Sequence, residues 1–124
     1  MKQSLIILFY LSITASAYSN HSGIDSLLRA LPESKGNSTV DILNTLGWEL
    51  KYENTNDAFK YAREALQLAE KSNYKKGKSV AIRNLAALHL LTNNGKEAIQ
   101  YANEGILFAT AIRDTFTLAK LYNI

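Results

Sequence analysis

The chain has 124 residues, a length that fits one modest domain, with 47% hydrophobic and 20% charged side chains and a net charge of +3. This composition can bury a core and excludes disorder over most of the chain. The charge is too balanced to indicate nucleic acid, so we expect no nucleic-acid partner. Cysteine is absent, which excludes disulfides, thiolate metal sites and a cysteine nucleophile.

Residues 1–17 have the three-part layout of a secretory signal. Residues 1–3 form a positive start, residues 5–13 an apolar run, and Ala15 and Ala17 stand at the two positions that a signal peptidase reads. The apolar run is about nine residues long, whereas a membrane-spanning helix needs roughly 20. We therefore expect cleavage after Ala17 and an exported, periplasmic or extracytoplasmic protein. An uncleaved anchor or a buried first helix is the alternative.

Residues 18–39 predict a short helix followed by a polar connector. Residues 24–31 contain the apolar positions of the helix, and Pro32 is expected to end it because proline cannot continue the hydrogen-bond ladder. Such a helix can cover one end of the elements that follow.

An internal repeat with a step of 40 residues begins near residue 40. Leu46 returns as Leu85 after 39 residues, so the turn between the helices of the first unit is expected to be shorter by one residue than that of the second. Four positions keep the full step: Ala58 returns as Ala98, Tyr61 as Tyr101, Ala62 as Ala102 and Glu64 as Glu104.

Each unit is predicted to be a pair of helices. In the first helix, Leu43, Leu46, Gly47 and Leu50 recur at helical spacing, and the turn-forming residues 54–57 follow. The second helix carries small and aromatic residues on one face, from Ala58 to Ala69. We expect residues 72–77 to close it, with Lys71 and Lys75 near its negative end and Gly77 as the stop.

Small residues are predicted to let the paired helices approach closely. They occupy the first helices as Gly47 and Ala86, and the second helices as Ala58, Ala98, Ala65 and Gly105.

The spacing of Leu46-Gly47, Ala58 and Ala65-Leu66 resembles the tetratricopeptide repeat, whose pattern runs Trp-x2-Leu-Gly-x2-Tyr, then Ala, an aromatic residue and Ala. The resemblance covers residues 40–124. Several positions depart from the pattern: Leu43 replaces the tryptophan, Leu50 and His89 the tyrosine, and Ala62 and Ala102 the aromatic residue. The period exceeds the usual 34 by about six, which we attribute to a longer second helix and a connector over residues 73–78. A HEAT- or armadillo-like solenoid, with periods of about 40 to 47, is the alternative.

The resemblance implies an all-α fold, a right-handed solenoid of stacked antiparallel helix pairs. Its units would be residues 40–77, residues 78–113 and, over residues 114–124, the start of a truncated third repeat. Apolar surface at this open C-terminal end is expected to promote self-association. The leader, the short helix and residues 43–50 together are similar to the exported N-terminal region of repeat-bearing sensor histidine kinases, which implies a sensory context.

The family lines its inner groove with the first helix of each unit. The resemblance therefore implies a groove formed by Asn44, Trp48 and Lys51 in the first unit and by Arg83, Ala87 and Leu90 in the second. Trp48, Lys51 and Arg83 can hold an acidic or extended peptide by stacking and by charge-assisted hydrogen bonds. The alternative is that Trp48 packs between units while Lys51 and Arg83 are solvated.

We predict no catalytic residue, no cofactor site and no metal site. His21 and His89 lack metal-ligand spacing, and His89, on an apolar face, is expected to be packed and hydrogen-bonded. Neither a Gly-x-Ser-x-Gly elbow nor a glycine-rich phosphate loop occurs. The basic cluster Lys71, Lys75, Lys76 and Lys78 is interpreted as a solvated turn that suits the helix dipole.

Three function classes follow. The first is a noncatalytic protein-interaction module in the extracytoplasmic part of a truncated signal-transduction protein, which contacts membrane only through the signal or a missing C-terminal span. The second is a free-standing periplasmic adaptor in envelope assembly. The third, an enzyme, would need catalytic residues beyond the visible chain.

Overall fold

The computed structural model describes residues 21–124, and every regular element in this range is helical, without any β-strand. The predicted signal over residues 1–17 lies outside the described residues. Two compact units are distinguished, residues 1–33 and residues 34–124. In the first unit, residues 21–30 are α-helical and the 3₁₀ helix η1 (Leu31–Glu33) contains Pro32, so the α-helix gives way to a tighter turn just before the proline.

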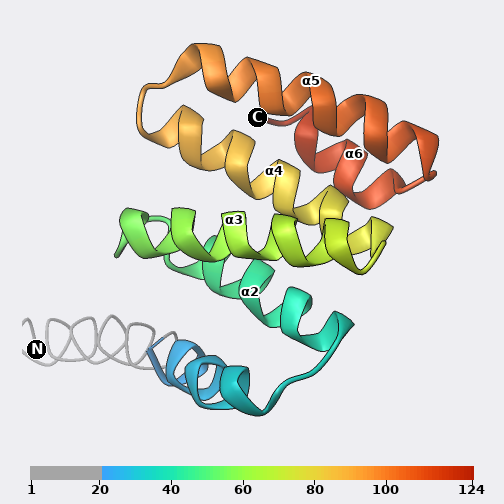
Figure 1. Ribbon diagram of the computed structural model, residues 1–124. Coiled ribbons are helices and arrows are strands. Elements are labelled where there is room, and N and C mark those ends of the chain that lie inside the picture. The colour runs from blue at the N-terminus through green and yellow to red at the C-terminus, as the bar shows by residue number, and fades with distance from the viewer. Residues whose placement is uncertain (1–20) are drawn as a thin grey trace, which may run out of the picture. The chain divides into compact units, whose positions relative to one another are not determined.

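The second unit contains five α-helices in chain order (Figure 1). They are α2 (Asn37–Glu49), α3 (Thr55–Lys71), α4 (Lys75–Leu91), α5 (Gly95–Ala111) and α6 (Thr115–Leu121). From α3 onward the helices start 20 residues apart, at Thr55, Lys75, Gly95 and Thr115. The 40-residue repeat of the sequence is thus two helices of 17 residues with two short turns. None of the described helices is both long and apolar enough to cross a membrane.

The three turns that follow α3, α4 and α5 have the same left-handed geometry. Asn73, Asn93 and Arg113 have φ values of 53°, 60° and 58°. In each turn the next residue donates its backbone N–H to a carbonyl five residues back, at 2.8 Å, as in Asn94 to His89. Asparagine tolerates this conformation better than other non-glycine residues, so the sequence marks two of these three turns.

The predicted connector over residues 73–78, with Gly77 as a helix stop, is wrong. Gly77 lies in the first turn of α4 and is buried. A Cβ atom at this position would lie 2.6 Å from Cγ1 of Val40 and 2.5 Å from Cδ1 of Tyr74. Glycine is therefore required because α4 approaches α2 closely here, and the long period comes from long helices rather than from a long connector.

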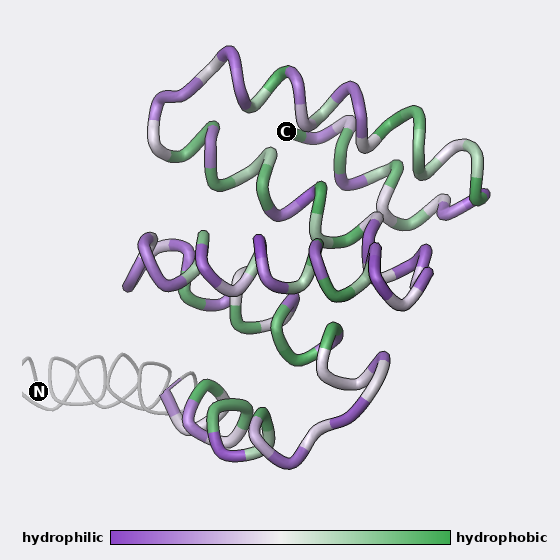
Figure 2. Tube along the Cα trace, in the orientation of Figure 1, coloured by the Kyte–Doolittle hydropathy of each residue, from purple (hydrophilic) through white to green (hydrophobic). Residues whose placement is uncertain are grey.

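The helices of the second unit fall into two sets according to their contacts. Each helix packs against the next one along the chain, and α4 also contacts both α2 and α6. The helices α3 and α5 have no close backbone contact with each other in the described structure. In Figure 2, hydrophilic colour predominates along α3, whereas hydrophobic colour is more frequent along the central helix α4. The helices α2, α4 and α6 therefore share one face of this unit, and we call it the α2–α4–α6 face.

The core lies where α4 meets its neighbours. One cluster consists of Ala58, Ala62, Leu85 and Leu88, and a second contains Ala86, Ala109 and Leu121. Gly47 lies against the backbone of α3, since a Cβ atom there would be 3.3 Å from the carbonyl oxygen of Ala58 and from the amide nitrogen of Ala62. The prediction of close helix approach at Gly47 is confirmed. At Gly105 the neighbours are instead side chains, namely Leu121 and Ile82.

Candidate functional site

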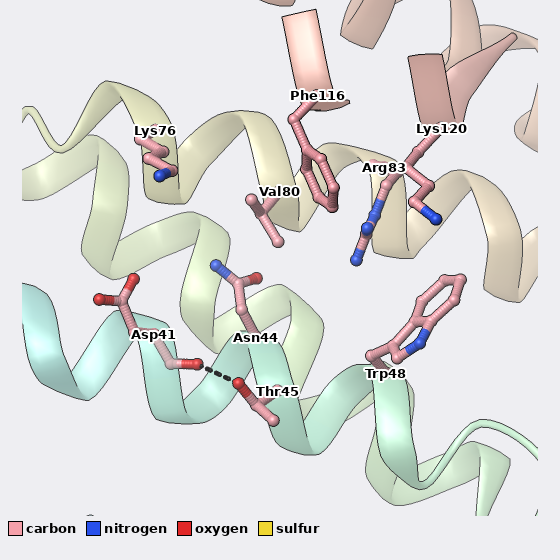
Figure 3. Close-up of a pocket in the computed structure, with 9 residues that line it drawn as sticks. All are labelled: Asp41, Asn44, Thr45, Trp48, Lys76, Val80, Arg83, Phe116 and Lys120. Atoms are coloured by element: carbon pink, nitrogen blue, oxygen red, sulfur yellow. Dashed lines mark hydrogen bonds between the residues drawn. The ribbon is translucent and has the colours of Figure 1, made fainter. Parts of the chain in front are cut away.

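Three helices enclose a pocket on the α2–α4–α6 face, with a cavity volume of about 360 Å³ (Figure 3). We call it the cationic pocket. It is lined by Asp41, Asn44, Thr45 and Trp48 of α2, by Lys76, Val80 and Arg83 of α4, and by Phe116 and Lys120 of α6.

A second pocket of about 430 Å³ adjoins the first and shares Trp48 with it. We call it the apolar pocket because most of its lining is hydrocarbon or aromatic. It is lined by Trp48, Lys51, Tyr52, Ala87, Leu90, Leu91, Asn123 and Ile124. All six predicted groove residues thus lie in these two pockets: Asn44 and Arg83 in the first, Lys51, Ala87 and Leu90 in the second, and Trp48 in both.

Arg83 lines the cationic pocket and has only 8% of its surface exposed. Its Nε and Nη2 atoms donate to Oδ1 of Asn84, at 3.2 and 2.6 Å, and its guanidinium carbon lies 4.4 Å from the centroid of the Trp48 ring. Figure 3 shows the side chain directed toward Trp48. Burial lowers the pKa of Arg83, and the Asp114 carboxylate opposes this, but a guanidinium remains charged in proteins. The alternative of a solvated Arg83 is therefore wrong.

Asn84 fixes the position of Arg83 within the fold. This fully buried amide donates through Nδ2 to the backbone oxygen of Asn44, at 2.9 Å, and so joins α4 to α2. Its Oδ1 is the acceptor for Arg83. The guanidinium is thus held toward Trp48 by a core amide, whereas a surface arginine would sample many rotamers.

Lys51 contacts the same tryptophan. Its Nζ lies 3.8 Å from the Trp48 ring centroid and donates to the backbone oxygen of Trp48, at 3.1 Å. Burial lowers the pKa of Lys51; the Arg83 cation lowers it further, and Glu49 acts in the opposite direction. Two cations, Lys51 and Arg83, therefore contact the Trp48 ring, and both can bind an anion placed near it.

Asn44 has one satisfied and one unsatisfied polar atom. Its Nδ2 donates to the carbonyl oxygen of Gly77, at 3.0 Å, whereas its buried Oδ1 has no hydrogen-bond partner. The residue is 5% exposed and lines the cationic pocket. Because buried polar atoms are nearly always hydrogen-bonded, this oxygen is an acceptor that lacks its usual donor.

Positive charge exceeds negative charge in the cationic pocket. Lys76, Arg83 and Lys120 line it together with one carboxylate, Asp41, whose Oδ1 already accepts a hydrogen bond from the Tyr74 hydroxyl at 2.9 Å. Within the described part of the chain the one ion pair joins Lys78 to Glu70, and neither residue lines this pocket. Burial raises the pKa of Tyr74, and its bond to Asp41 raises it further.

The prediction missed the contribution of α6 to the groove. Phe116 and Lys120 line the cationic pocket and follow Lys76 and Val80 by 40 residues each, so the repeat step could have located them. Asp41, Thr45, Lys76 and Val80 were also missed; they lie on the same faces of α2 and α4 as the predicted residues. Thr45 donates to the backbone oxygen of Asp41, at 2.8 Å, which is the bond drawn in Figure 3.

His89 lies apart from both pockets, between two aromatic rings. Its ring stacks on Tyr101, with centroids 5.4 Å apart, and meets Phe59 edge-on at 4.9 Å. The predicted packed position is confirmed. The predicted hydrogen bond is wrong for Nδ1, which is buried without a partner. Burial lowers the pKa of His89 below its usual value; Glu97 raises it and Arg63 lowers it further.

The basic cluster also differs from its interpretation. Lys71 ends α3, where a cation suits the helix dipole, but Lys75, Lys76 and Lys78 lie in the first turns of α4, at its positive end. Lys78 is compensated by Glu70, at 3.1 Å. Lys76 instead reaches the cationic pocket and adds to its charge.

The arrangement can hold a ligand that combines negative charge with apolar or planar groups. The described residues contain no group of three or more His, Cys, Asp or Glu side chains that could hold a metal ion.

Comparisons with protein-family models, with characterised proteins and with solved structures give no match.

Proposed function

We propose that this chain is a noncatalytic protein-interaction module of the tetratricopeptide type, whose groove on the α2–α4–α6 face binds an acidic or extended peptide. Support for a right-handed solenoid of this type comes from the equal 17-residue length of α3, α4 and α5, the 20-residue step from α3 onward and the two sets of helices. In such a stack the first helices of successive units line one concave face, and here that set would be α2, α4 and α6.

The observation that carries the proposal is the environment of Trp48. It is the single tryptophan of the chain, it lies in both pockets, and Lys51 and Arg83 each contact its ring. Interfaces concentrate binding energy in a few side chains, among which tryptophan and arginine are enriched.

Peptide selection tests this proposal. Peptides selected from a displayed random library on the natural chain should lose roughly tenfold or more in affinity on substitution of Trp48→Ala or Arg83→Ala, because both changes remove groove contacts. The matched control is Arg63→Ala: Arg63 also contacts a ring, that of Phe59 at 5.0 Å, but it lies on α3 outside both pockets. Unchanged affinity in both groove variants, with helical circular dichroism retained, would remove the groove assignment.

We further propose that the module belongs to the extracytoplasmic, sensory part of a signal-transduction protein such as a histidine kinase. The leader-like residues 1–17 and the resemblance of the following segment to exported sensor proteins support this context. The alternative is a free-standing periplasmic adaptor in envelope assembly. The DNA downstream of codon 124 separates the two: further repeats, a membrane span and a kinase core support the first, and a stop codon within an envelope operon supports the second.

A further inference from the structure

The cationic pocket and the apolar pocket meet at Trp48, which gives the groove two chemically different halves. Arg83, Lys76 and Lys120 line one half, and Leu90, Leu91 and Tyr52 line the other. Leu90 is 47% exposed, Leu91 42% and Tyr52 74%, so this apolar surface is open to a ligand. One ligand that spans Trp48 would meet cations on one side and hydrocarbon on the other.

Arg83 favours an anionic ligand group in the cationic pocket. The residue is only 8% exposed, and within the described residues it forms no ion pair: its side-chain bonds go to the neutral amide of Asn84, and the Asp114 carboxylate acts on it only through space. A buried charge without a directly bonded counterion is costly, and a carboxylate that binds the guanidinium would reduce this cost. Lys120 at the same pocket adds attraction to the same anion.

Asn44 favours a ligand with a hydrogen-bond donor beside that anion. Its unpartnered Oδ1 is buried in the wall of the same pocket. The backbone N–H of an extended peptide is such a donor, and it accompanies an acidic side chain wherever the peptide lies along the groove. A bare inorganic anion would satisfy Arg83 and leave Asn44 without a partner.

We propose that the groove recognises an extended peptide in which an acidic residue and a large apolar residue are two positions apart. The carboxylate binds Arg83 and Lys120, a backbone N–H binds Oδ1 of Asn44, and the apolar side chain enters the pocket of Leu90 and Leu91 across Trp48. Two positions is the shortest spacing in an extended chain that points both side chains to the same side, and the two pockets adjoin at Trp48. This inference rests on the proposed peptide groove and specifies its ligand.

Titration followed by tryptophan fluorescence tests the proposal on the full chain, since Trp48 is the single tryptophan and lies in both pockets. The probe is an alanine heptapeptide with blocked ends, an aspartate at its third position and a leucine at its fifth. Blocked ends remove the terminal charges, so only the internal carboxylate can bind Arg83.

Four altered peptides separate the contributions. Replacement of aspartate by asparagine should weaken binding roughly tenfold, because a charged hydrogen bond is lost. Replacement of leucine by serine should weaken it by a similar factor. Moving leucine next to aspartate should also weaken binding, since the two side chains then point to opposite sides. N-methylation of the aspartate amide should weaken it about fivefold, because Asn44 loses its donor.

Variants of the protein identify the residues that produce the preference for aspartate over asparagine. Arg83→Gln should abolish the preference for aspartate over asparagine, and Lys120→Gln should reduce it. Lys120 is exposed, so its variant keeps the test valid even where the Arg83 variant unfolds. The matched control Lys96→Gln removes an exposed lysine of α5 outside both pockets and should leave the preference unchanged.

Equal binding of all five peptides would overturn this inference while leaving the peptide groove intact. Absence of any fluorescence change with the original peptide would overturn it as well, and library selection would then decide the proposed function separately.

Discussion

Arg83 and His89 are two basic side chains of α4 that both contact aromatic rings, yet their surroundings differ. Arg83 lies toward Trp48 in an open pocket, is held by Asn84, and keeps its charge without an ion-pair partner in the described structure. His89 lies between Phe59 and Tyr101, with a buried Nδ1 and a lowered pKa that favours the neutral ring. The first contact leaves charge available to a ligand, whereas the second contributes to the packing of α3, α4 and α5.

The largest expected loss of stability comes from substitution of Asn84, the residue that holds the Arg83 side chain in place. Asn84→Ala should lower the free energy of unfolding by about 3 kcal/mol, since it removes the bond to the backbone oxygen of Asn44 and strands the donors of Arg83 in the core. Peptide affinity should fall as well, because Arg83 loses its fixed orientation. Urea denaturation followed by circular dichroism measures the first effect, with exposed Asn103→Ala as the control expected within about 0.5 kcal/mol of the natural chain. An equally stable Asn84 variant would show that the amide does not join α2 to α4.

A smaller loss of stability is expected on the His89 side. Tyr101→Ala removes a partly buried ring that stacks on His89 and packs on the Ala58–Leu85 cluster, and it should cost about 2 kcal/mol. Peptide affinity should not change once the chain is folded, because Tyr101 lines neither pocket. Thermal melts and the Trp48 fluorescence titration, run on the same variant, measure the two quantities. A loss of peptide affinity in the folded Tyr101 variant would contradict the separation of the packing around His89 from the peptide groove.

The smallest effect is a dependence of stability on pH that should arise from His89. Its pKa is lowered in the folded chain, so the unfolded chain takes up a proton first as the pH falls below about 6.5. The free energy of unfolding should therefore decrease from pH 7 toward pH 5.5 and level off below the lowered pKa. His89→Phe retains an aromatic ring and removes the titration, so urea denaturation across this range should show a flatter profile. An identical slope in the variant would assign the pH dependence to other groups.

The sequence predicted the helical class because its signals are local. Apolar residues at helical spacing and polar turns are properties of neighbouring positions, and every regular element in the described residues is helical as expected. Two of the three left-handed turns were also marked locally, by asparagine. The repeat step also relates Phe116 and Lys120 to Lys76 and Val80, 40 residues earlier.

Gly77, Arg83 and Asn44 depended on the tertiary structure. Glycine near a run of lysines is typical of a helix end, but the approach of Val40 from α2 is what requires Gly77. Whether an arginine is solvated or buried depends on Asn84 and Trp48, which only helix packing brings to it. Likewise, the carbonyl oxygen of Gly77 in α4 takes up Nδ2 of Asn44, while the buried Oδ1 of the same amide has no partner. Periodicity fixes which face of a helix is apolar, whereas burial and hydrogen-bond partners depend on atoms far away in the chain.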